Sequence, residues 1–359
     1  MNFSINPSAN PLPADKRQEI LSNPGFGTNF TDHMAMVKYT AGTGWHDAHI
    51  TARAPITIDP ATAVLHYAQE IFEGMKAYKL ADGTMALFRP DANAARFNRS
   101  ARRLAMPELP EEIFLESIRK LVDIDRDWFP DVEGGSIYLR PFMFASEAFL
   151  GVRPSNEYLY MVIASPAGGY FKSGAPAIKI WVSQHYSRAA PGGTGAAKCG
   201  GNYAASLIAQ QEASAHGCDQ VVFLDAAEHK WVEELGGMNL FFLLEGGHMI
   251  TPPTSGTILE GITRKSIIQL ARDQGLIVEE KPYSISEWRD DAQSGKLVEC
   301  FACGTAAVVT PVGTVASEEG EFTIGAGGPG QITQQLRRQL VNIQRGLAED
   351  RYGWVQRID

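Results

Sequence analysis

The fold is decided by a stretch of twelve residues, GGTGAAKCGGNY, at positions 192–203. It holds five glycines, Lys198 and, five residues later, Tyr203. Glycines allow positive φ and let the backbone approach a bound group closely. A lysine presented inside a cavity loses hydration, so its pKa falls and it becomes a nucleophile or a Schiff-base former. A flexible surface loop with a solvated lysine is equally compatible with this composition. A phosphate-binding P-loop is excluded, because Ala197 precedes the lysine and Cys199 follows it.

Length and composition indicate a cytoplasmic protein of two domains. The chain has 359 residues, of which 44% are apolar and 20% charged, as in soluble globular proteins. Its net charge of −9 argues against nucleic acid and anionic membranes as partners. The N-terminus shows no signal-peptide pattern. The most apolar window, residues 297–316, includes Glu299 and Pro311, so buried strands fit it better than a membrane span.

A proline- and glycine-rich segment, PAGGYFKSGAP at positions 166–176, is the clearest linker. We expect a smaller N-terminal α/β domain over 1–166, a linker over 167–176, and a larger C-terminal α/β domain over 177–359 that carries the lysine. In the first domain we expect an irregular arm over 1–35 and a helix over 62–72.

Two arginines and a helix start are candidate anion sites. Arg96 lies on an expected helix over 90–104, where it is either part of a solvated basic face or turned inward to an anion. Arg140 lies between aromatic residues on an expected strand over 136–145, so it needs a partner if it is buried. Thr263 is the expected N-cap of a helix, and a helix N-terminus binds anions readily.

Cysteine and histidine patterns point to no metal site. Cys300 and Cys303 have Cys-x-x-Cys spacing, but there is no second pair for zinc, and the segment reads as a strand of small buried residues. His46 and His49 fit surface positions better than a ligand pair.

These parts together suit pyridoxal phosphate chemistry. That cofactor needs a lysine, donors for its phosphate, and an acid that keeps the pyridine nitrogen protonated as an electron sink. Glu234, at the end of an expected strand before two glycines, is a candidate for the acid, and the alternative is an exposed carboxylate at a strand end.

Several long motifs, in order along nearly the whole chain, closely resemble the branched-chain amino acid aminotransferases, which are fold-type IV pyridoxal phosphate enzymes (the D-amino-acid aminotransferase-like α+β fold). The longer subgroup, which includes the eukaryotic forms, is the most similar. The motifs are LHY at 65–67, FEG at 72–74, LFRP at 87–90 with Arg96, YLRP at 138–141, the stretch 192–203, EELGGMN at 233–239, EGITR at 260–264 and GTA at 304–306.

The resemblance implies a role for each matching cofactor residue. Lys198 forms the internal aldimine and moves a proton between the substrate Cα and the cofactor. Tyr203 bonds the cofactor's phenolate oxygen, and Glu234 pairs with its ring nitrogen. The phosphate is held by Arg96, the backbone N–H groups of Ile262 and Thr263, and Thr305.

The resemblance also implies the substrate pocket and a homodimer. The N–H groups of Ala306 and Ala307 would hold the α-carboxylate of the substrate, and Arg140 the distal carboxylate of glutamate. The apolar wall would consist of Tyr67, Phe72, Tyr138 and Tyr170. In the family, the positions of Tyr67, Leu150 and Val152 reach into the neighbouring subunit's site. The implied reaction is a reversible ping-pong transfer of nitrogen between L-leucine, L-isoleucine or L-valine and 2-oxoglutarate.

The chain departs from the family in two places. The redox pair of one family member falls at Ala307 and Thr310 here, so redox regulation is not implied. Gly237 stands where a threonine often lies beside the substrate, which removes one hydroxyl contact.

Two rival interpretations remain. One stays within the fold and is a D-amino-acid aminotransferase or an aminodeoxychorismate lyase, although the YLRP and ELGGMN segments favour the branched-chain type. The other is a non-catalytic binding or redox protein that uses the glycine stretch and Cys300/Cys303.

Overall fold

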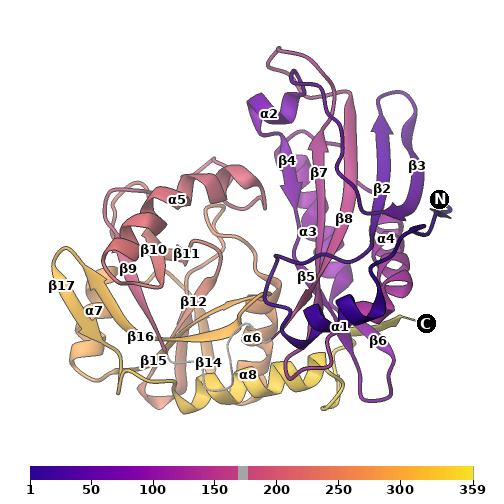
Figure 1. Cartoon of the computed structure of the whole chain (residues 1–359). Helices are drawn as coiled ribbons and strands as arrows, with labels where there is room; N and C mark the ends of the chain where they lie inside the picture. The colour runs from indigo at the N-terminus through magenta and orange to yellow at the C-terminus, as the bar shows by residue number, and fades with distance from the viewer. Residues whose placement is uncertain (169–176, 359) are drawn as a thin grey trace. The chain divides into compact units, whose positions relative to one another are not determined.

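The computed structural model describes residues 1–168 and 177–358, and these residues form two compact units (Figure 1). The first unit contains residues 1–168, 197–200 and 343–358, and the second contains residues 177–196 and 201–342. The expected linker over 167–176 therefore lies almost entirely outside the described residues.

The division differs from the expected C-terminal domain over 177–359 in two places. Residues 197–200, which include Lys198, group with the first unit because their backbone bonds to Phe72 and Ser100. The C-terminal residues group with it because Val355–Ile358 form a strand that pairs with Met85–Phe88.

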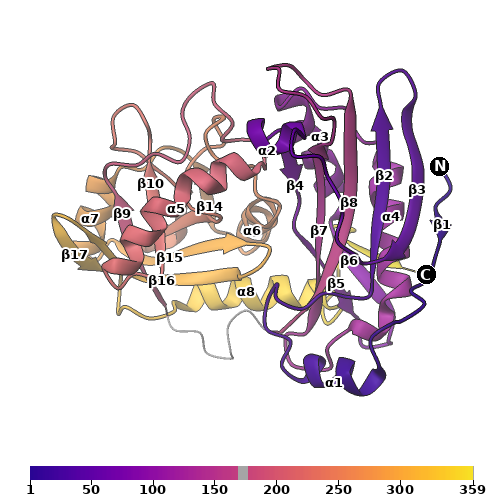
Figure 2. The same ribbon diagram turned by 45° about the horizontal axis from the view of Figure 1, so that its top comes forward.

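The first unit is a sheet with two long helices, α3 (Pro90–Arg103) and α4 (Glu111–Ile124), against one face (Figures 1 and 2). Its strands are β1 (Ser4–Ile5), β2 (His33–Thr40), β3 (Gly44–Ala52), β4 (Glu70–Phe72), β5 (Met75–Lys79), β6 (Met85–Phe88), β7 (Ser136–Ala145), β8 (Glu157–Ala167) and β18 (Val355–Ile358). Its helices are α1 (Ala14–Ser22), α2 (Ala63–Tyr67), α3 (Pro90–Arg103), α4 (Glu111–Ile124) and the 3₁₀ turn η1 (Arg126–Trp128). The order is β1-β3-β2-β8-β7-β5-β6-β18, with β4 beside β7, and every pair except β1–β3 is antiparallel.

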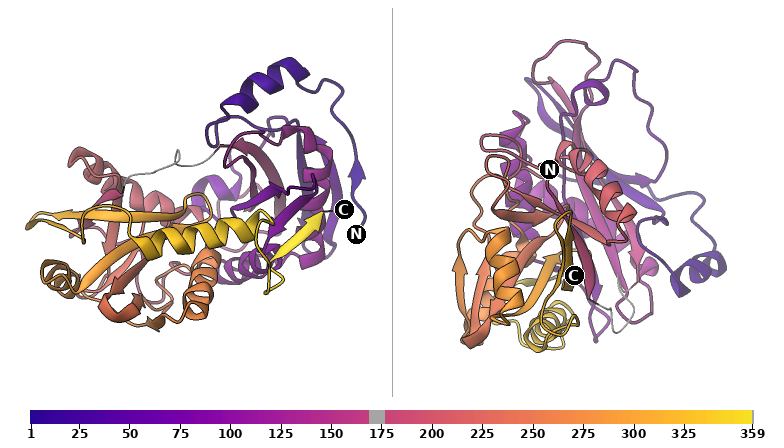
Figure 3. Two further views of the ribbon diagram at one scale, coloured as in Figure 1. Left: turned by 90° about the horizontal axis from the view of Figure 1, so that it is seen from below. Right: turned by 90° about the vertical axis from the view of Figure 1, so that its left-hand side faces the viewer.

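The second unit is a mixed sheet of order β11-β10-β9-β16-β15-β12-β13-β14, in which β11 also pairs with β12 and so closes part of the sheet into a ring. Its strands are β9 (Ile178–Ser183), β10 (Gln220–Leu224), β11 (Val232–Leu235), β12 (Asn239–Leu244), β13 (His248–Thr251), β14 (Ile277–Glu280), β15 (Leu297–Gly304), β16 (Val308–Ser317) and β17 (Gly320–Thr323). Its helices are α5 (Gly200–Ala215), α6 (Ile262–Asp273), α7 (Ile285–Gln293), α8 (Gln331–Gln344) and the 3₁₀ turn η2 (Glu245–Gly247), with α8 the long yellow helix of Figure 3.

Alternating burial on β7 explains how it presents Arg140. Ile137 and Leu139 are fully buried in the core of the first unit, as the alternation of the sequence predicts. Tyr138 and Arg140 point to the opposite face and are only half-buried. The apolar residues therefore anchor the strand while the arginine faces away from the core.

Two expectations for the first unit were wrong. The helix expected over 62–72 is only the short α2, because Ala68 adopts the left-handed conformation with φ of +49° and ends it. The residues that follow enter β4, which pairs with β7. The arm over 1–35 is not irregular throughout, since it contains β1, α1 and the start of β2.

Helix α6 also starts differently from the expectation. Its N-cap is Gly261, without a side-chain cap, so Thr263 is the second helical residue and not the cap. The capping box of the second unit lies elsewhere, on α7, where Ser284 and Glu287 bond each other's backbone N–H groups.

Candidate active site

Lys198 lies in the first unit immediately before α5, on a backbone that is held by hydrogen bonds. Its C=O accepts the Phe72 N–H at 3.0 Å, and its N–H donates to the Ser100 hydroxyl at 2.9 Å. The amine lies 4.7 Å from the centroid of the Phe72 ring, and the residue is half-buried. The lysine is thus presented against an aromatic face.

Arg140 shares this aromatic surface. Its guanidinium carbon lies 4.8 Å from the Phe72 centroid, and one of its N–H groups donates to the Tyr138 hydroxyl at 3.1 Å. Its Nε is buried and has no hydrogen-bond partner among the described residues. A buried donor without an acceptor is costly, so this arginine suits an anionic ligand.

Tyr138 has two close neighbours, and one of them, Phe26, is a residue that sequence reasoning missed. The ring of Phe26 meets the Tyr138 ring edge-on at 4.9 Å. A Cβ at Gly74 would collide with the Tyr138 hydroxyl, so a larger residue there would displace the tyrosine side chain. Phe26 lies in the arm that was expected to be irregular, and no motif marks it.

Arg96 faces inward from α3. Of the two positions that helical spacing left open, the interior and the solvated face, the structure shows the interior. It is 4% exposed, and it forms a bidentate ion pair with Glu73, which is fully buried. The Nε–Oε1 and Nη2–Oε2 distances are 2.8 and 2.7 Å. Asn93 donates to the same carboxylate at 2.7 Å. This arrangement fixes the direction of the guanidinium plane.

A half-buried carboxylate, Glu70, lies beside the lysine segment. It accepts the N–H of Gly200. Burial raises the pKa of the Glu70 carboxyl, and the Gly200 N–H and the charge of Arg140 oppose that rise.

Three further residues predicted for the site lie on the exposed side of the first unit. The Tyr67 hydroxyl donates to the Leu150 C=O at 2.9 Å, which joins α2 to the loop before β8. Leu150 and Val152 are 70% and 91% exposed. The structure therefore brings Tyr67 and Leu150 together, and leaves Val152 on the same loop in contact with solvent.

In the second unit, Glu234 is a buried carboxylate with several donors. Its side chain accepts the Leu259 N–H at 2.9 Å and the Asn239 amide at 3.1 Å, and it pairs with Arg188 at 2.6 Å. Glu234 is 3% exposed, which excludes the exposed strand-end alternative. Three donors favour the ionised form of this carboxylate.

Arg188 is a second residue that sequence reasoning missed. It is buried, it donates to the C=O groups of Gly195 and Thr257, and its Nε has no hydrogen-bond partner in the described part of the chain. The sequence could have marked Arg188 by its position, because it lies after a buried strand and four residues before the glycine stretch.

The remaining predicted residues of the second unit lie at a helix start, a turn and a helix face. Ile262 and Thr263 are the first two residues of α6, whose N-terminal N–H groups have no partner within the helix. Thr305, Ala306 and Ala307 form the turn between β15 and β16. The ring of Tyr203, on α5, lies beside Gly237, where an added Cβ would be 3.7 Å away. Tyr170 lies outside the described residues.

The four cysteines all lie among the described residues, where they are buried and form no disulfide. Cys300 and Cys303 lie on β15, as the sequence indicates. Burial raises the pKa of the Cys303 thiol to about 12 and that of Cys300 well above its usual value, so both are poor nucleophiles. Cys199 packs in the core of the first unit.

Within residues 1–168 and 177–358, no three His, Cys, Asp or Glu side chains gather where they could hold a metal ion. No helix in this part of the chain is long and apolar enough to cross a membrane.

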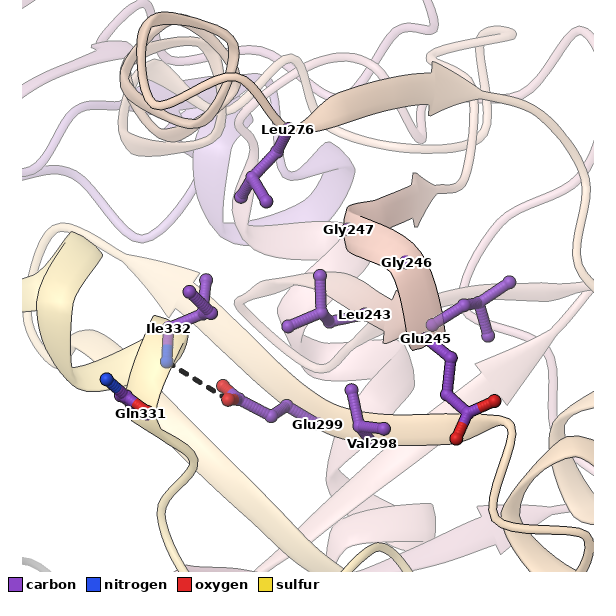
Figure 4. Close-up of a pocket in the computed structure, with 10 residues that line it drawn as sticks. Leu243, Glu245, Gly246, Gly247, Leu276, Val298, Glu299, Gln331 and Ile332 are labelled. Atoms are coloured by element: carbon purple, nitrogen blue, oxygen red, sulfur yellow. Dashed lines mark hydrogen bonds between the residues drawn. The ribbon is translucent and has the colours of Figure 1, made fainter.

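A separate pocket of about 590 Å³ lies in the second unit, and none of the predicted site residues lines it (Figure 4). Its walls include Leu243, Leu276, Val298 and Ile332. The hydrogen bond drawn in the figure joins the Ile332 N–H to Glu299, whose carboxylate also accepts the N–H and hydroxyl of Thr333 at the start of α8. This carboxylate therefore accepts N–H groups at the N-terminus of α8 that have no partner within the helix.

Comparison with known proteins identifies the family. Residues 70–315 match the family model described as amino-transferase class IV. The chain is 55% identical to the branched-chain-amino-acid aminotransferase of Mycolicibacterium smegmatis, over 100% of this chain and 99% of that protein. It is 53% identical to the enzyme of the same name from Mycobacterium tuberculosis, over 100% and 98% of the two chains.

Solved structures that match this chain are also branched-chain amino acid aminotransferases. The branched-chain amino acid aminotransferase of Escherichia coli has a TM-score of 0.72 and 29% identity, and the match covers 90% of this chain and 99% of that one. The branched-chain amino acid aminotransferase of T.th. with pyridoxamine 5'-phosphate has a TM-score of 0.74 and 30% identity, with equal coverage. The chain therefore belongs to the branched-chain-amino-acid aminotransferases of aminotransferase class IV.

Proposed function

We propose that this protein transfers an amino group reversibly between L-leucine, L-isoleucine or L-valine and 2-oxoglutarate, with pyridoxal 5'-phosphate as cofactor. The observation that carries the proposal is the arrangement around Phe72. One ring contacts both a lysine amine, which can react with a carbonyl, and an arginine whose buried Nε lacks an acceptor among the described residues. An amine and a carboxylate receptor on one apolar surface suit substrates that are amino acids with either an apolar or an acidic side chain.

The residues present fit the cofactor. Bound pyridoxal phosphate supplies a carbonyl carbon for the amino group and a protonated ring that withdraws electrons. Lys198 would attach the cofactor, and its amine would then move a proton from the substrate Cα to the carbon of the cofactor that carried the carbonyl. Glu234 would accept a hydrogen bond from the ring nitrogen. Its three donors suit a charged carboxylate, which would pair with a protonated ring nitrogen. Tyr203 would bond the ring oxygen.

Phosphate would be bound by groups of two kinds. The N–H groups of Ile262 and Thr263 lie at the start of α6, where the helix dipole favours an anion. Arg96 would add a charged donor, and Thr305 a hydroxyl. Because Glu73 fixes the guanidinium of Arg96, little side-chain entropy would be lost on binding.

Substrate would be held at both ends. The N–H groups of Ala306 and Ala307, in the turn after β15, would bind the α-carboxylate. Arg140 would bind the distal carboxylate of glutamate. When leucine is bound, the Tyr138 hydroxyl would accept the hydrogen bond of the Arg140 guanidinium. The apolar wall would be formed by Phe72, Tyr138, Tyr67 and Tyr170.

We also propose a homodimer in which each subunit completes the other's pocket. Support comes from the exposed apolar set of Tyr67, Leu150 and Val152. Large exposed apolar patches commonly mark protein–protein interaction sites, and a partner subunit would cover these side chains. A cytoplasmic location is part of the same proposal, because four buried cysteines that form no disulfide suit a reducing compartment.

The test is an assay of purified holoenzyme with 2-oxoglutarate and either L-leucine or D-alanine. We expect glutamate formation with L-leucine. Activity with D-alanine alone would contradict the proposal and favour a D-amino-acid aminotransferase of the same class.

A further inference from the structure

The backbone on both sides of Lys198 is held by two side chains that the proposed chemistry does not use. Before the lysine side chain, the Lys198 N–H donates to the Ser100 hydroxyl on α3 at 2.9 Å. After it, the Gly200 N–H donates to the Glu70 carboxylate on β4. Between them, the Lys198 C=O accepts the Phe72 N–H. All of these groups belong to the first unit.

Ser100 is a polar residue in an apolar setting. It is fully buried on the inner face of α3, where its helix neighbours Phe97 and Ala101 are apolar core residues. A buried hydroxyl is costly unless it is hydrogen-bonded. The Ser100 hydroxyl accepts the Lys198 N–H, so the lysine backbone supplies a hydrogen bond that this buried hydroxyl needs.

Glu70 occupies the space that a side chain at position 200 would need. A Cβ on Gly200 would collide with the Glu70 carboxylate, so the glycine brings the start of α5 against this acid. A carboxylate that accepts an N–H at a helix start also interacts favourably with the helix dipole. The contact thus ties the residues that follow the lysine to β4.

We propose that Ser100 and Glu70 are positioning residues, which together hold the Lys198 backbone so that its amine stays over the Phe72 ring. This inference rests on the proposed function, because it assigns the purpose of the contacts to the reacting lysine. A lysine side chain is long and flexible, so a fixed backbone limits where its amine can reach. Reacting groups must be placed closely, and an error of about 1 Å can cost up to about a hundredfold in rate.

Two readouts test this role, one during cofactor uptake by the full chain and one on the holoenzyme. The first is the rate at which apo protein gains the visible band when pyridoxal phosphate is added. The second is the rate at which saturating L-leucine removes that band in a single half-reaction. We expect Ser100→Ala and Glu70→Ala each to slow both rates about tenfold. Glu70→Gln keeps an acceptor oxygen and should recover most of the rate.

Matched controls separate positioning from general stability. Ser117→Ala removes another fully buried hydroxyl, bonded to the Phe114 C=O and the Tyr160 hydroxyl of the first unit. Glu287→Ala removes another carboxylate that accepts an N–H at a helix start. Both should lower the thermal midpoint without slowing either reaction.

The outcomes are distinct. If Ser100→Ala and Glu70→Ala react no more slowly than Ser117→Ala and Glu287→Ala, the positioning role is overturned. If Ser100→Ala does not fold, the Glu70 variants decide, since Glu70 is only half-buried. A wild-type protein whose band forms but ignores L-leucine contradicts the proposed function, and the rates of band formation still decide the positioning role.

Discussion

The guanidinium carbon of Arg140 lies 4.8 Å from the centroid of the Phe72 ring, and its buried Nε has no hydrogen-bond partner among the described residues. The amine of Lys198 lies 4.7 Å from the same centroid. A cation–aromatic contact attracts a positive group without taking its charge away, so the Arg140 guanidinium stays charged against this ring. One ring therefore holds a reactive amine and a guanidinium ready for a substrate.

Removing Arg140 should harm glutamate more than leucine. Arg140→Ala deletes the donor to a distal carboxylate, which costs about 1.5–3 kcal/mol, or about tenfold or more in kcat/KM. The apolar contacts of leucine remain. Half-reactions with each amino acid alone, followed by the visible band, measure the two effects separately. Equal losses for both substrates would contradict the distal-carboxylate role.

Neutralising Glu73 should destabilise the protein strongly. Glu73→Gln leaves the Arg96 guanidinium buried beside a neutral amide, and breaking a buried pair costs about 3–5 kcal/mol. We expect a lower midpoint in denaturant unfolding and weaker retention of pyridoxal phosphate. Glu349→Gln is the control, because it breaks an ion pair with Arg351 whose side chains are both more than 70% exposed. Similar midpoints for the two variants would rule out the structural role of the buried pair.

A side chain should be tolerated at Gly237. An added Cβ would meet only the Tyr203 ring, at the ordinary contact distance of 3.7 Å, and the backbone there is not left-handed. Gly237→Thr should keep the wild-type thermal midpoint and change the KM values for amino acids. At Gly74 the added Cβ would strike the Tyr138 hydroxyl, so Gly74→Ala should lower the midpoint. Equal losses of stability at both glycines would refute this distinction.

The loop that carries Leu150 and Val152 should loosen in acid. The Arg153 guanidinium and the Asn156 N–H hold the pKa of the Glu147 carboxyl at about 2. Because this value lies below that of an unfolded glutamate, about 4.5, the contact stabilises the fold above pH 4.5. That contribution is lost as the pH falls towards 2.

Thermal unfolding of the wild type and of Glu147→Gln at a series of pH values checks this sign. The two proteins should differ most near neutral pH and converge as the pH falls, because acid removes in the wild type the charge that the substitution removes. A difference that stays constant with pH would show that ionisation of Glu147 does not matter.

Local sequence pattern was enough to predict strand β7 and the start of helix α3. The alternation of β7 and the proline at the start of α3 appear where expected. Helix α2 ends early because Ala68 is left-handed, and no residue type forces that conformation there. Thr263 was mistaken for a cap because Gly261 caps α6 without a side chain.

The residues of the candidate site also fall into two groups: those that sequence motifs indicate and those whose position depends on tertiary contacts. Lys198 and Glu234 were predicted from motifs; the structure places Lys198 half-buried and Glu234 buried. Whether Arg96 faced solvent or the interior depended on Glu73, a tertiary partner that helical spacing cannot reveal. Phe26 and Arg188 were missed for the same reason, since each takes its place only through contacts that are distant in sequence.

The most direct test of the account mixes purified holoenzyme with L-leucine alone. The visible band of bound pyridoxal phosphate should disappear, with one 2-oxo acid formed per subunit, and 2-oxoglutarate should restore the band. Lys198→Ala should show no such cycle. A band that L-leucine leaves unchanged and D-alanine removes would contradict the account.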